Sequence, residues 1–378
     1  MCSKSRSIRV LVSLAVAITM FASACSSDDV GDVATATSGG AESTCFADPG
    51  IDPIATPTGD LAGTTITLVT HDSFFVSEGT LKAFTDETGI VVEQVAAGDA
   101  GQLVSSAVLT IDNPTADVMF GIDNAFLCRG LEAGLFLPYE ATRLGDVHAE
   151  LAVDPHHRVT PVDFGDVCVN YWVDALPGAA PASLDDLTEA DFADQFVTMN
   201  PETSSPGFAF LLATIAKYGE DGWEDYWSGL VDNGVEITAG WSDAYYGSFT
   251  AGGGTRSVVT SYASSPPAEF LFADPPVDAP PTEVLFDSCF RQIEFAGILA
   301  GTEHPEAAAA LIEFMLSETF QSDIPENMFV YPANSTIALP DSFVRFGATA
   351  DDPLIIDPAV IEANRDDWTE RWTTVVLR

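Results

Sequence analysis

Positively charged residues are scarce in this chain. Lysine and arginine together number 14, against 57 aspartate and glutamate residues, so the formal net charge is −43 at pH 7. A charge of this sign and size repels the phosphates of nucleic acids and the surface of anionic membranes. The composition therefore excludes these partners and favours a cationic or neutral ligand. An alternative interpretation of the acidity is a solubility or salt adaptation spread over the whole surface.

Motifs of common catalytic sites are also absent. The sequence has no G-x-S-x-G elbow, no Walker A loop, no H-E-x-x-H and no C-x-x-C. His156 and His157 are adjacent, so on a helix or a strand their side chains point in different directions, and a shared metal ion is not expected. His71, Asp72 and Ser73 follow a predicted strand, but contiguous residues on an extended segment cannot form a catalytic triad. We therefore predict neither an enzyme nor a metal or cofactor site.

An apolar run over residues 11–21 follows a basic segment near the N-terminus. Small residues come next and lead directly to Cys25, an order typical of a bacterial lipoprotein signal. The run is too short to span a membrane. We predict a signal peptide over 1–24 and a lipid on Cys25 that holds the exported protein at the outer face of the cytoplasmic membrane, or in the periplasm. An ordinary signal peptide with an incidental cysteine is the alternative.

Residues 25–63 contain few large apolar side chains and are rich in glycine, alanine, serine, threonine and aspartate. Such a composition predicts a flexible tether, because it cannot bury enough surface to fold alone. The remainder is longer than one hydrophobic core usually accommodates. We therefore expect a first lobe over 64–165, a second lobe over 166–288, and a return of 289–378 to the first lobe with C-terminal helices.

Two of the six cysteines belong to the predicted signal peptide and lipidation site. The other four, an even number in an exported protein, indicate two disulfides with three possible pairings. Cys168 and Cys289 both lie in strand-like runs, so we favour the pair Cys168–Cys289. The second pair, Cys45–Cys128, would then fasten the start of the fold.

Strand and helix patterns alternate in the first half of the fold. The predicted elements are a strand over 64–70, a helix over 77–87, a strand over 90–95, a helix over 100–109 and a strand over 117–120. This order indicates a parallel sheet covered by helices, and a second unit of the same kind follows from residue 167. We predict an α/β fold of two lobes, each a mostly parallel sheet flanked by helices, with a ligand cleft between them.

Three loops of the second predicted lobe gather aromatic, carboxylate and hydroxyl groups. They are Asn200–Gly207, which leads into an apolar helix, Gly240–Tyr246, and Ser261–Pro266, which ends a strand. Together they offer an aromatic wall with cation–π attraction and hydroxyl groups at a helix N-terminus. Taken singly, each has a structural alternative: Trp241 as a core residue, and the serines as caps and turns. Their recurrence in one lobe favours a binding site.

These loops, with several segments of the first lobe, resemble the thiamine-binding substrate-binding proteins of bacterial ABC importers. The similarity runs in order from Thr65 to Arg378. The segments that carry it are THDSF at 70–74, ADVMFGIDN at 116–124, PVDFG at 161–165, TSSPG at 203–207, GWSDAY at 240–245, SYASSP at 261–266 and YP at 331–332. The resemblance implies a two-lobed, type II periplasmic binding fold that closes on thiamine or its phosphates. It also implies delivery to an ABC permease and its ATPase, by a monomer.

The resemblance also implies ligand contacts at particular residues. Asp99 would hydrogen-bond the aminopyrimidine, and Trp241 and Tyr262 would face the rings, with the thiazolium cation drawn to their π faces. Ser204 and Ser205, at a helix start, suit the hydroxyethyl end or a phosphate. The remaining contacts carried over are Ala100, Ala263, Ser264 and Ser265.

The chain departs from the family pattern at four cleft positions. His71, which precedes Asp72 in the predicted cleft loop, stands where the family has an aromatic residue, and Ala100 replaces a glycine. Phe329 replaces a tryptophan, and Ala268 replaces a tyrosine. We expect His71, Asp72 and Phe329 to line the ligand site as well. These departures leave the vitamin class in place but leave its phosphorylation state open.

Two other functions remain as alternatives. Thiaminase I is an enzyme with the same fold and a cysteine nucleophile, and Cys168 would serve that role as a free thiol. A receptor for a ferric ion would need clustered tyrosine, histidine and carboxylate ligands, which the sequence does not show.

Overall fold

The structure is a computed structural model that describes residues 44–377. The predicted signal peptide, Cys25 and the first part of the predicted tether lie outside the described residues. Residues 44–63 contain no helix or strand, and Cys45 in this segment is bonded to Cys128. Within residues 44–377, no helix combines the length and the hydropathy that crossing a bilayer requires.

One continuous sheet runs through the fold in the strand order β2-β1-β3-β9-β5-β8-β6-β7. Strands β1, β2 and β3 are parallel and form one end of the sheet, and β6, β7 and β8 are parallel and form the other. The bounds of these strands are β1 Thr65–Thr70, β2 Val91–Ala96, β3 Val118–Asp123, β6 Phe196–Met199, β7 Glu236–Thr238 and β8 Val258–Tyr262.

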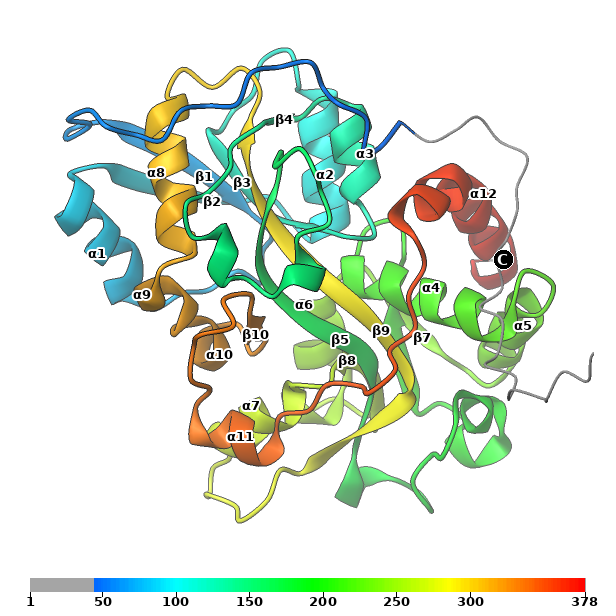
Figure 1. Ribbon diagram of the computed structural model, residues 1–378. Helices are drawn as coiled ribbons and strands as arrows, with labels where there is room; N and C mark the ends of the chain where they lie inside the picture. Colours follow the sequence, from blue (N-terminus) through cyan, green and yellow to red (C-terminus); the bar gives the residue numbers. More distant parts are fainter. Residues whose placement is uncertain (1–43, 378) are drawn as a thin grey trace, which may run out of the picture. The chain divides into compact units, whose positions relative to one another are not determined.

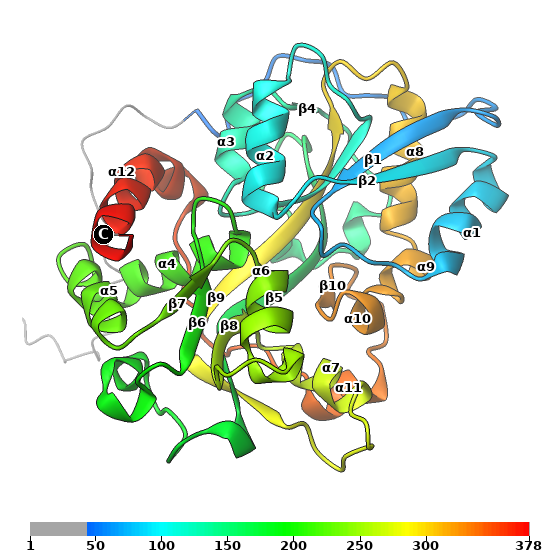
Figure 2. The same ribbon diagram turned by 180° about the vertical axis from the view of Figure 1, so that it is seen from behind.

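Two long antiparallel strands join the two ends of the sheet. They are β5 (Thr160–Trp172) and β9 (Thr282–Leu299), which pair with each other over most of their length. Figure 1 shows them side by side across the middle of the fold, in green and yellow, and Figure 2 shows β6, β7 and β8 beside them from behind. Two short strands complete the sheet: β4 (Phe136–Leu137) pairs with β9, and β10 (Tyr331–Pro332) pairs with β5.

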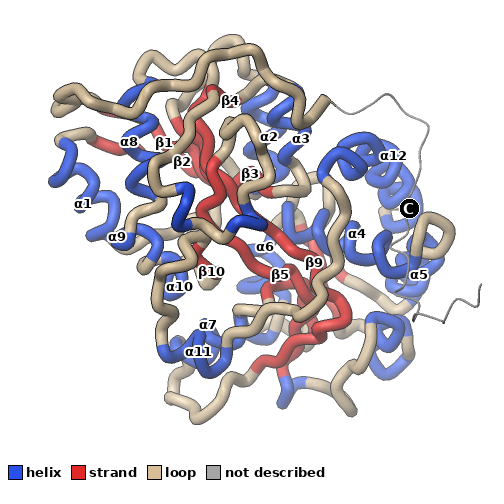
Figure 3. Tube along the Cα trace, viewed as in Figure 1, coloured by secondary structure: helices blue, strands red, loops and turns tan. Residues whose placement is uncertain are grey.

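Helices flank the sheet, as Figure 3 shows in blue against the red strands. At the β1–β3 end they are α1 (Glu78–Thr88), α2 (Ala100–Leu109), α3 (Leu127–Glu132) and α8 (Pro305–Met315). At the other end, α4 (Ser205–Tyr218) packs on β9, and α5 (Trp223–Asp232) packs on α4. The shorter helices are α6 (Trp241–Asp243), α7 (Ser265–Leu271), α9 (Glu318–Gln321), α10 (Ile324–Asn327) and α11 (Asp341–Phe346).

The burial of each strand follows from its composition. Strand β3 is apolar along most of its length and is buried at every residue, as expected of a parallel strand with helices on both faces. Strand β1 alternates between more and less buried positions. The predicted α/β class is therefore confirmed. The structure adds that the two groups of parallel strands belong to one sheet, because β5 and β9 pass from one group to the other.

The structure contains both of the predicted disulfides. Cys168 on β5 is bonded to Cys289 on β9, so the bond links the two joining strands across their ladder. The Cys45–Cys128 bond attaches the segment before β1 to α3. Each bond closes a long loop, of 121 and 83 residues, and so removes much of the conformational freedom of the unfolded chain.

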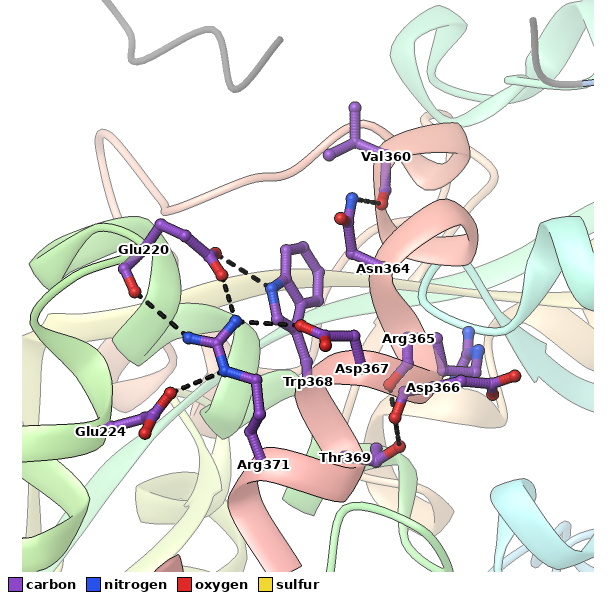
Figure 4. Close-up of polar contacts among 10 residues, drawn as sticks. All are labelled: Glu220, Glu224, Val360, Asn364, Arg365, Asp366, Asp367, Trp368, Thr369 and Arg371. Atoms are coloured by element: carbon purple, nitrogen blue, oxygen red, sulfur yellow. Dashed lines mark hydrogen bonds and ion pairs between the residues drawn. The ribbon is translucent and has the colours of Figure 1, made fainter. Parts of the chain in front are cut away.

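The final helix, α12 (Pro358–Val376), packs against α5 and also contacts α3. Figure 4 shows how Arg371 of α12 holds α5 in place. Its guanidinium binds Glu224 and Glu220, and the indole N–H of Trp368 donates to Glu220 at 3.0 Å. The guanidinium also lies over the ring of Trp223, at 5.0 Å from its centre.

A second arginine of α12 lies in the interior. The Arg365 guanidinium lies over the rings of Phe126 and Phe208, at 4.3 and 4.5 Å from their centres, and the two rings contact each other. It also donates to the carbonyl oxygen of Ala125 and to Glu362. Phe126 lies between β3 and α3, and Phe208 belongs to α4, which follows β6. Arg365 therefore connects segments from the two groups of parallel strands.

We predict that Arg365→Leu lowers the free energy of unfolding by about 2–4 kcal/mol, because a desolvated cation–π contact and buried hydrogen bonds are lost. Chemical denaturation measures the change. Arg345→Leu is the matched control, since Arg345 also lies beside two aromatic rings but its side chain is 48% exposed, against 5% for Arg365. The control should cost less than about 1 kcal/mol. Equal losses in the two variants would contradict the role given to burial.

Candidate functional site

A cavity of about 590 Å³ lies beside β9 and collects loops from both ends of the sheet. Its size falls within the range typical of small-molecule sites, roughly 300–1,000 Å³. The first end contributes the loop after β1 and the start of α2. The second end contributes the starts of α4 and α7 and the α6 region, and the segment between α10 and β10 completes the wall.

Most of the predicted ligand contacts line this cavity. The nine that do so are His71, Asp72, Asp99, Ala100, Ser205, Trp241, Tyr262, Ser265 and Phe329. The sequence separates the first of these from the last by more than 250 positions, and the fold brings them to one place.

Three predicted contacts lie behind the wall instead, fully buried. Ser204 caps α4, and its hydroxyl accepts from the N–H of Gly207 at 3.4 Å. Ser264 donates to the carbonyl oxygen of Phe329 at 2.6 Å. Ala263 packs against the Cys168–Cys289 disulfide. In this structure these residues support the wall of the cavity rather than form its surface.

The Asp99 carboxylate connects three segments of the site. It caps α2 and accepts from the N–H of Ala100 at 2.7 Å, while the N–H of Ser205 at the start of α4 donates at 3.0 Å and that of Trp241 at 3.2 Å. Burial raises the pKa of Asp99, and the hydrogen bonds from Ser205 and Trp241 counteract only part of that rise. Asp99 therefore holds the starts of α2, α4 and α6 together.

An aromatic group forms one side of the cavity. The rings of Trp241 and Tyr245 stack at 4.8 Å with an angle of 21° between their planes, and Tyr246 meets Trp241 edge-on. The indole N–H of Trp241 donates to the hydroxyl of Ser261 at 3.0 Å, and Ser261 in turn bonds to Ser265 at 2.8 Å. Trp241 is thus held in position by contacts within the protein, as a preorganised binding surface requires.

Polar side chains of β9 form the floor of the cavity. Gln292 donates to Asp123 at 2.9 Å and to the Ser205 hydroxyl at 2.7 Å, and Ser205 itself donates to Asp123. Glu294 lies 3.4 Å from Nε2 of His71. Gly121 of β3, with φ at +105°, makes room for this arrangement, because a Cβ there would lie 2.3 Å from the His71 ring.

A fourth acidic group, Asp163, lies beside Glu294 on the neighbouring strand β5. It stands opposite Glu294 in the β5–β9 ladder and is almost fully buried, and no described residue donates a hydrogen bond to its carboxyl oxygens. Burial and the nearby charge of Glu294 both raise the pKa of Asp163 well above its ordinary value. The charged form of Asp163 is therefore disfavoured, while Glu294 lies beside His71.

The sequence interpretation missed several residues that line the cavity. The most important are Gln292 and Glu294 on β9 and Glu269, Phe75 and Phe272 at the cavity wall. The two β9 residues were detectable, because alternate positions of a strand face the same side and both Gln292 and Glu294 are polar. Phe75 and Phe272, which are 60% and 72% exposed, carry no such signal.

The alternatives that required a free thiol or a metal cluster gain no support. Cys168 is bonded to Cys289, so it has no thiolate to act as a nucleophile. Within the part of the chain that the structure describes, no group of three histidine, cysteine or acidic side chains is placed to hold a metal ion.

Two groups of parallel strands joined by two long antiparallel strands, with a ligand-sized cavity beside the joining strands, define the class of type II periplasmic binding proteins. Residues 113–345 match the model of a family described as bacterial extracellular solute-binding protein. The chain belongs to this family. The resemblance drawn from the sequence motifs is confirmed at this level, and so is the two-lobed fold class.

Several relatives match this chain over nearly their whole length. The thiamine-binding periplasmic protein of Escherichia coli (strain K12) is 30% identical, over 83% of this chain and 94% of that protein. The protein of the same name from Brucella suis is 29% identical, over 83% and 92%. A solved structure of a periplasmic thiamin binding protein matches with a TM-score of 0.74 at 28% identity, covering 86% of this chain and all of that one. AfuA from Actinobacillus pleuropneumoniae, at 16% identity and a TM-score of 0.71, shares the fold alone.

The titration of His71 tests the electrostatics of the floor. Burial alone lowers the pKa of His71, but the charge of Glu294 and the contact with it, helped by Asp99 and Asp72, outweigh burial and raise the pKa above its usual 6.5. We predict that Glu294→Gln lowers the pKa of His71, as measured by NMR titration of the imidazole. Glu87→Gln, on the exposed side of α1, removes the same charge outside the cavity and should leave it unchanged.

The sign of the stability effect follows from the same shift. Because the folded-state pKa lies above the unfolded value, protonated His71 stabilises the fold fully below pH 6.5, and this contribution is lost as the pH rises through the folded-state pKa. The difference in stability between the native protein and Glu294→Gln should therefore shrink over that range. A difference that grows with pH would contradict the pairing.

Proposed function

We propose that this protein is an extracytoplasmic receptor that captures thiamine, or one of its phosphates, and delivers it to an ABC permease. The observation that carries the proposal is the composition of the cavity, where the stacked Trp241 and Tyr245 rings face a site rich in carboxylates. Thiamine joins an aromatic pyrimidine to a thiazolium cation, and both parts suit such a site. The names of the relatives at up to 30% identity support the same ligand.

The predicted contacts fit this ligand by their chemistry. Asp99 accepts three N–H groups and lines the cavity, where its carboxylate would accept a hydrogen bond from the amino group of the pyrimidine. Trp241 and Tyr262 offer ring faces to the pyrimidine and the thiazolium. Ala100 next to Asp99, and Ser265 next to Ser264 at the start of α7, supply small side chains that leave room for a ring.

Capture would proceed by closure of two lobes, at 64–165 and 166–288, with residues 289–378 returning to the first. Strands β5 and β9 are continuous from one group of parallel strands to the other, so bending of these strands would change the opening of the cavity. A receptor of this kind is selected for affinity rather than turnover, and we propose no reaction for it.

Anchoring at Cys25 would complete the transport role. A lipid on Cys25, followed by a flexible segment that ends where Cys45 is bonded to Cys128, would keep the receptor near its permease at high effective concentration. The monomer would then deliver its ligand to the permease and its ATPase at the outer face of the cytoplasmic membrane.

Calorimetric titration with thiamine, thiamine monophosphate and thiamine diphosphate tests the proposal. We expect saturable binding of at least one of them, and Trp241→Ala should weaken it about 5- to 150-fold, because a stacked aromatic contact with a cation is worth about 1–3 kcal/mol. Trp241→Phe, which keeps an aromatic ring, should retain most of the affinity of the native protein. Phe286→Ala, which removes an aromatic ring outside the cavity, is the control. Absence of heat with all three compounds would end the proposal.

A further inference from the structure

The charge of the cavity wall is one-sided. Four carboxylates line it, those of Asp72, Asp99, Glu269 and Glu294, and none of the lining residues in the described part of the chain is a lysine or an arginine. His71 is the one lining side chain there that can carry a positive charge, and it lies 3.4 Å from Glu294. Its charge is thus already matched within the protein.

The starts of helices α2 and α4, where a phosphate could bind, are also occupied by a group of the protein itself. Helix N-termini bind anions because their first N–H groups lack partners within the helix. Here the starts of α2 and α4 converge, but the N–H groups of Ala100 and Ser205 both donate to Asp99. The N–H of Gly207 donates to the hydroxyl of Ser204. A carboxylate of the protein itself therefore occupies the position that a phosphate would take.

The hydroxyl group of Ser205, at the start of α4, already has partners within the protein as well. Ser205 lines the cavity, but its hydroxyl donates to Asp123 and accepts from Gln292. To donate to a phosphate instead, Ser205 would have to leave the fully buried Asp123 carboxyl without that bond. Removing a hydrogen bond from a carboxyl group that stays buried is unfavourable.

The two states of the ligand differ in charge by more than one unit. Thiamine carries a single positive charge, whereas a phosphate monoester adds about −1.5 to −2 at pH 7. Placing this charge among four carboxylates, with no unmatched cation in the wall, is a like-charge arrangement of the kind that proteins use to reject wrong ligands. The cavity thus attracts the cation and repels its phosphate esters.

We infer that this site selects unphosphorylated thiamine over thiamine monophosphate and diphosphate, with Glu294 and Glu269 as the residues that set the selectivity. The inference rests on the proposed thiamine-binding function and narrows it to one ligand state. Both residues line the cavity; Glu294 lies beside His71 and Glu269 accepts from Tyr245, whereas Asp99 accepts from three N–H groups.

Competition calorimetry with the three compounds tests the inference. In the native protein, thiamine should bind at least about 100-fold more tightly than the monophosphate, and the diphosphate should bind more weakly still. Glu294→Gln removes one negative charge from the floor of the cavity and should narrow the ratio for the monophosphate about tenfold. Glu269→Gln also removes a negative charge and should narrow the affinity ratio in the same direction. Glutamine can still accept the hydrogen bond that Tyr245 donates to Glu269 at 2.8 Å. Glu87→Gln is the control and should leave the ratio unchanged.

The possible results distinguish the selectivity for unphosphorylated thiamine from the proposed binding of thiamine. Binding of all three compounds within about threefold, or tighter binding of a phosphate, would overturn the selectivity and leave the thiamine receptor in place. A selective native protein whose ratio is unmoved by both glutamine variants would overturn the assignment to Glu294 and Glu269. Loss of binding of all three compounds by the native protein would overturn both proposals together.

Discussion

The antiparallel pairing of β5 with β9 is the interaction on which the rest of the structure depends. These strands are the only connection by hydrogen bonds between the two groups of parallel strands in the described sheet. Their ladder places Asp163 opposite Glu294 and carries the Cys168–Cys289 bond. It therefore supplies the floor of the cavity, the disulfide beside its wall and the link between the two halves of the fold. Without this pairing, the cavity floor, the disulfide and the link between the two halves would all be lost.

The site is built around charges that the protein has already matched. Asp99 is bonded by three N–H groups, Glu294 faces His71, and Asp123 is bonded by Ser205 and Gln292. Buried charges are tolerated only with such partners. A ligand entering this site does not need to supply a counter-charge to any one group. Binding can instead draw on the combined field of several carboxylates and on the faces of the aromatic rings.

Proteins that share this fold bind chemically different ligands. Solved structures at 16–17% identity share the fold, and among them are a ferric binding protein from Campylobacter jejuni and AfuA with bound fructose-6-phosphate. Ligand identity therefore cannot be argued from the fold. The proposed ligand rests on Trp241, Tyr245 and the carboxylates of the cavity, and on the names of relatives at up to 30% identity.

The sequence by itself determined the local elements, the family and much of the site. The strands and helices from β1 to β3 follow from strong local periodicity, and motifs such as GWSDAY mark residues that do line the cavity. The favoured cysteine pairing also came from local strand patterns. What only the tertiary structure decided is how distant groups neutralise one another. That Glu294 meets His71, that Asp99 fills the start of α4, and that Ser204 and Ser264 lie behind the wall depend on contacts between residues far apart in the chain. The periodicity of a sequence reports which side of an element is buried, but it does not report which partner a buried charge will meet.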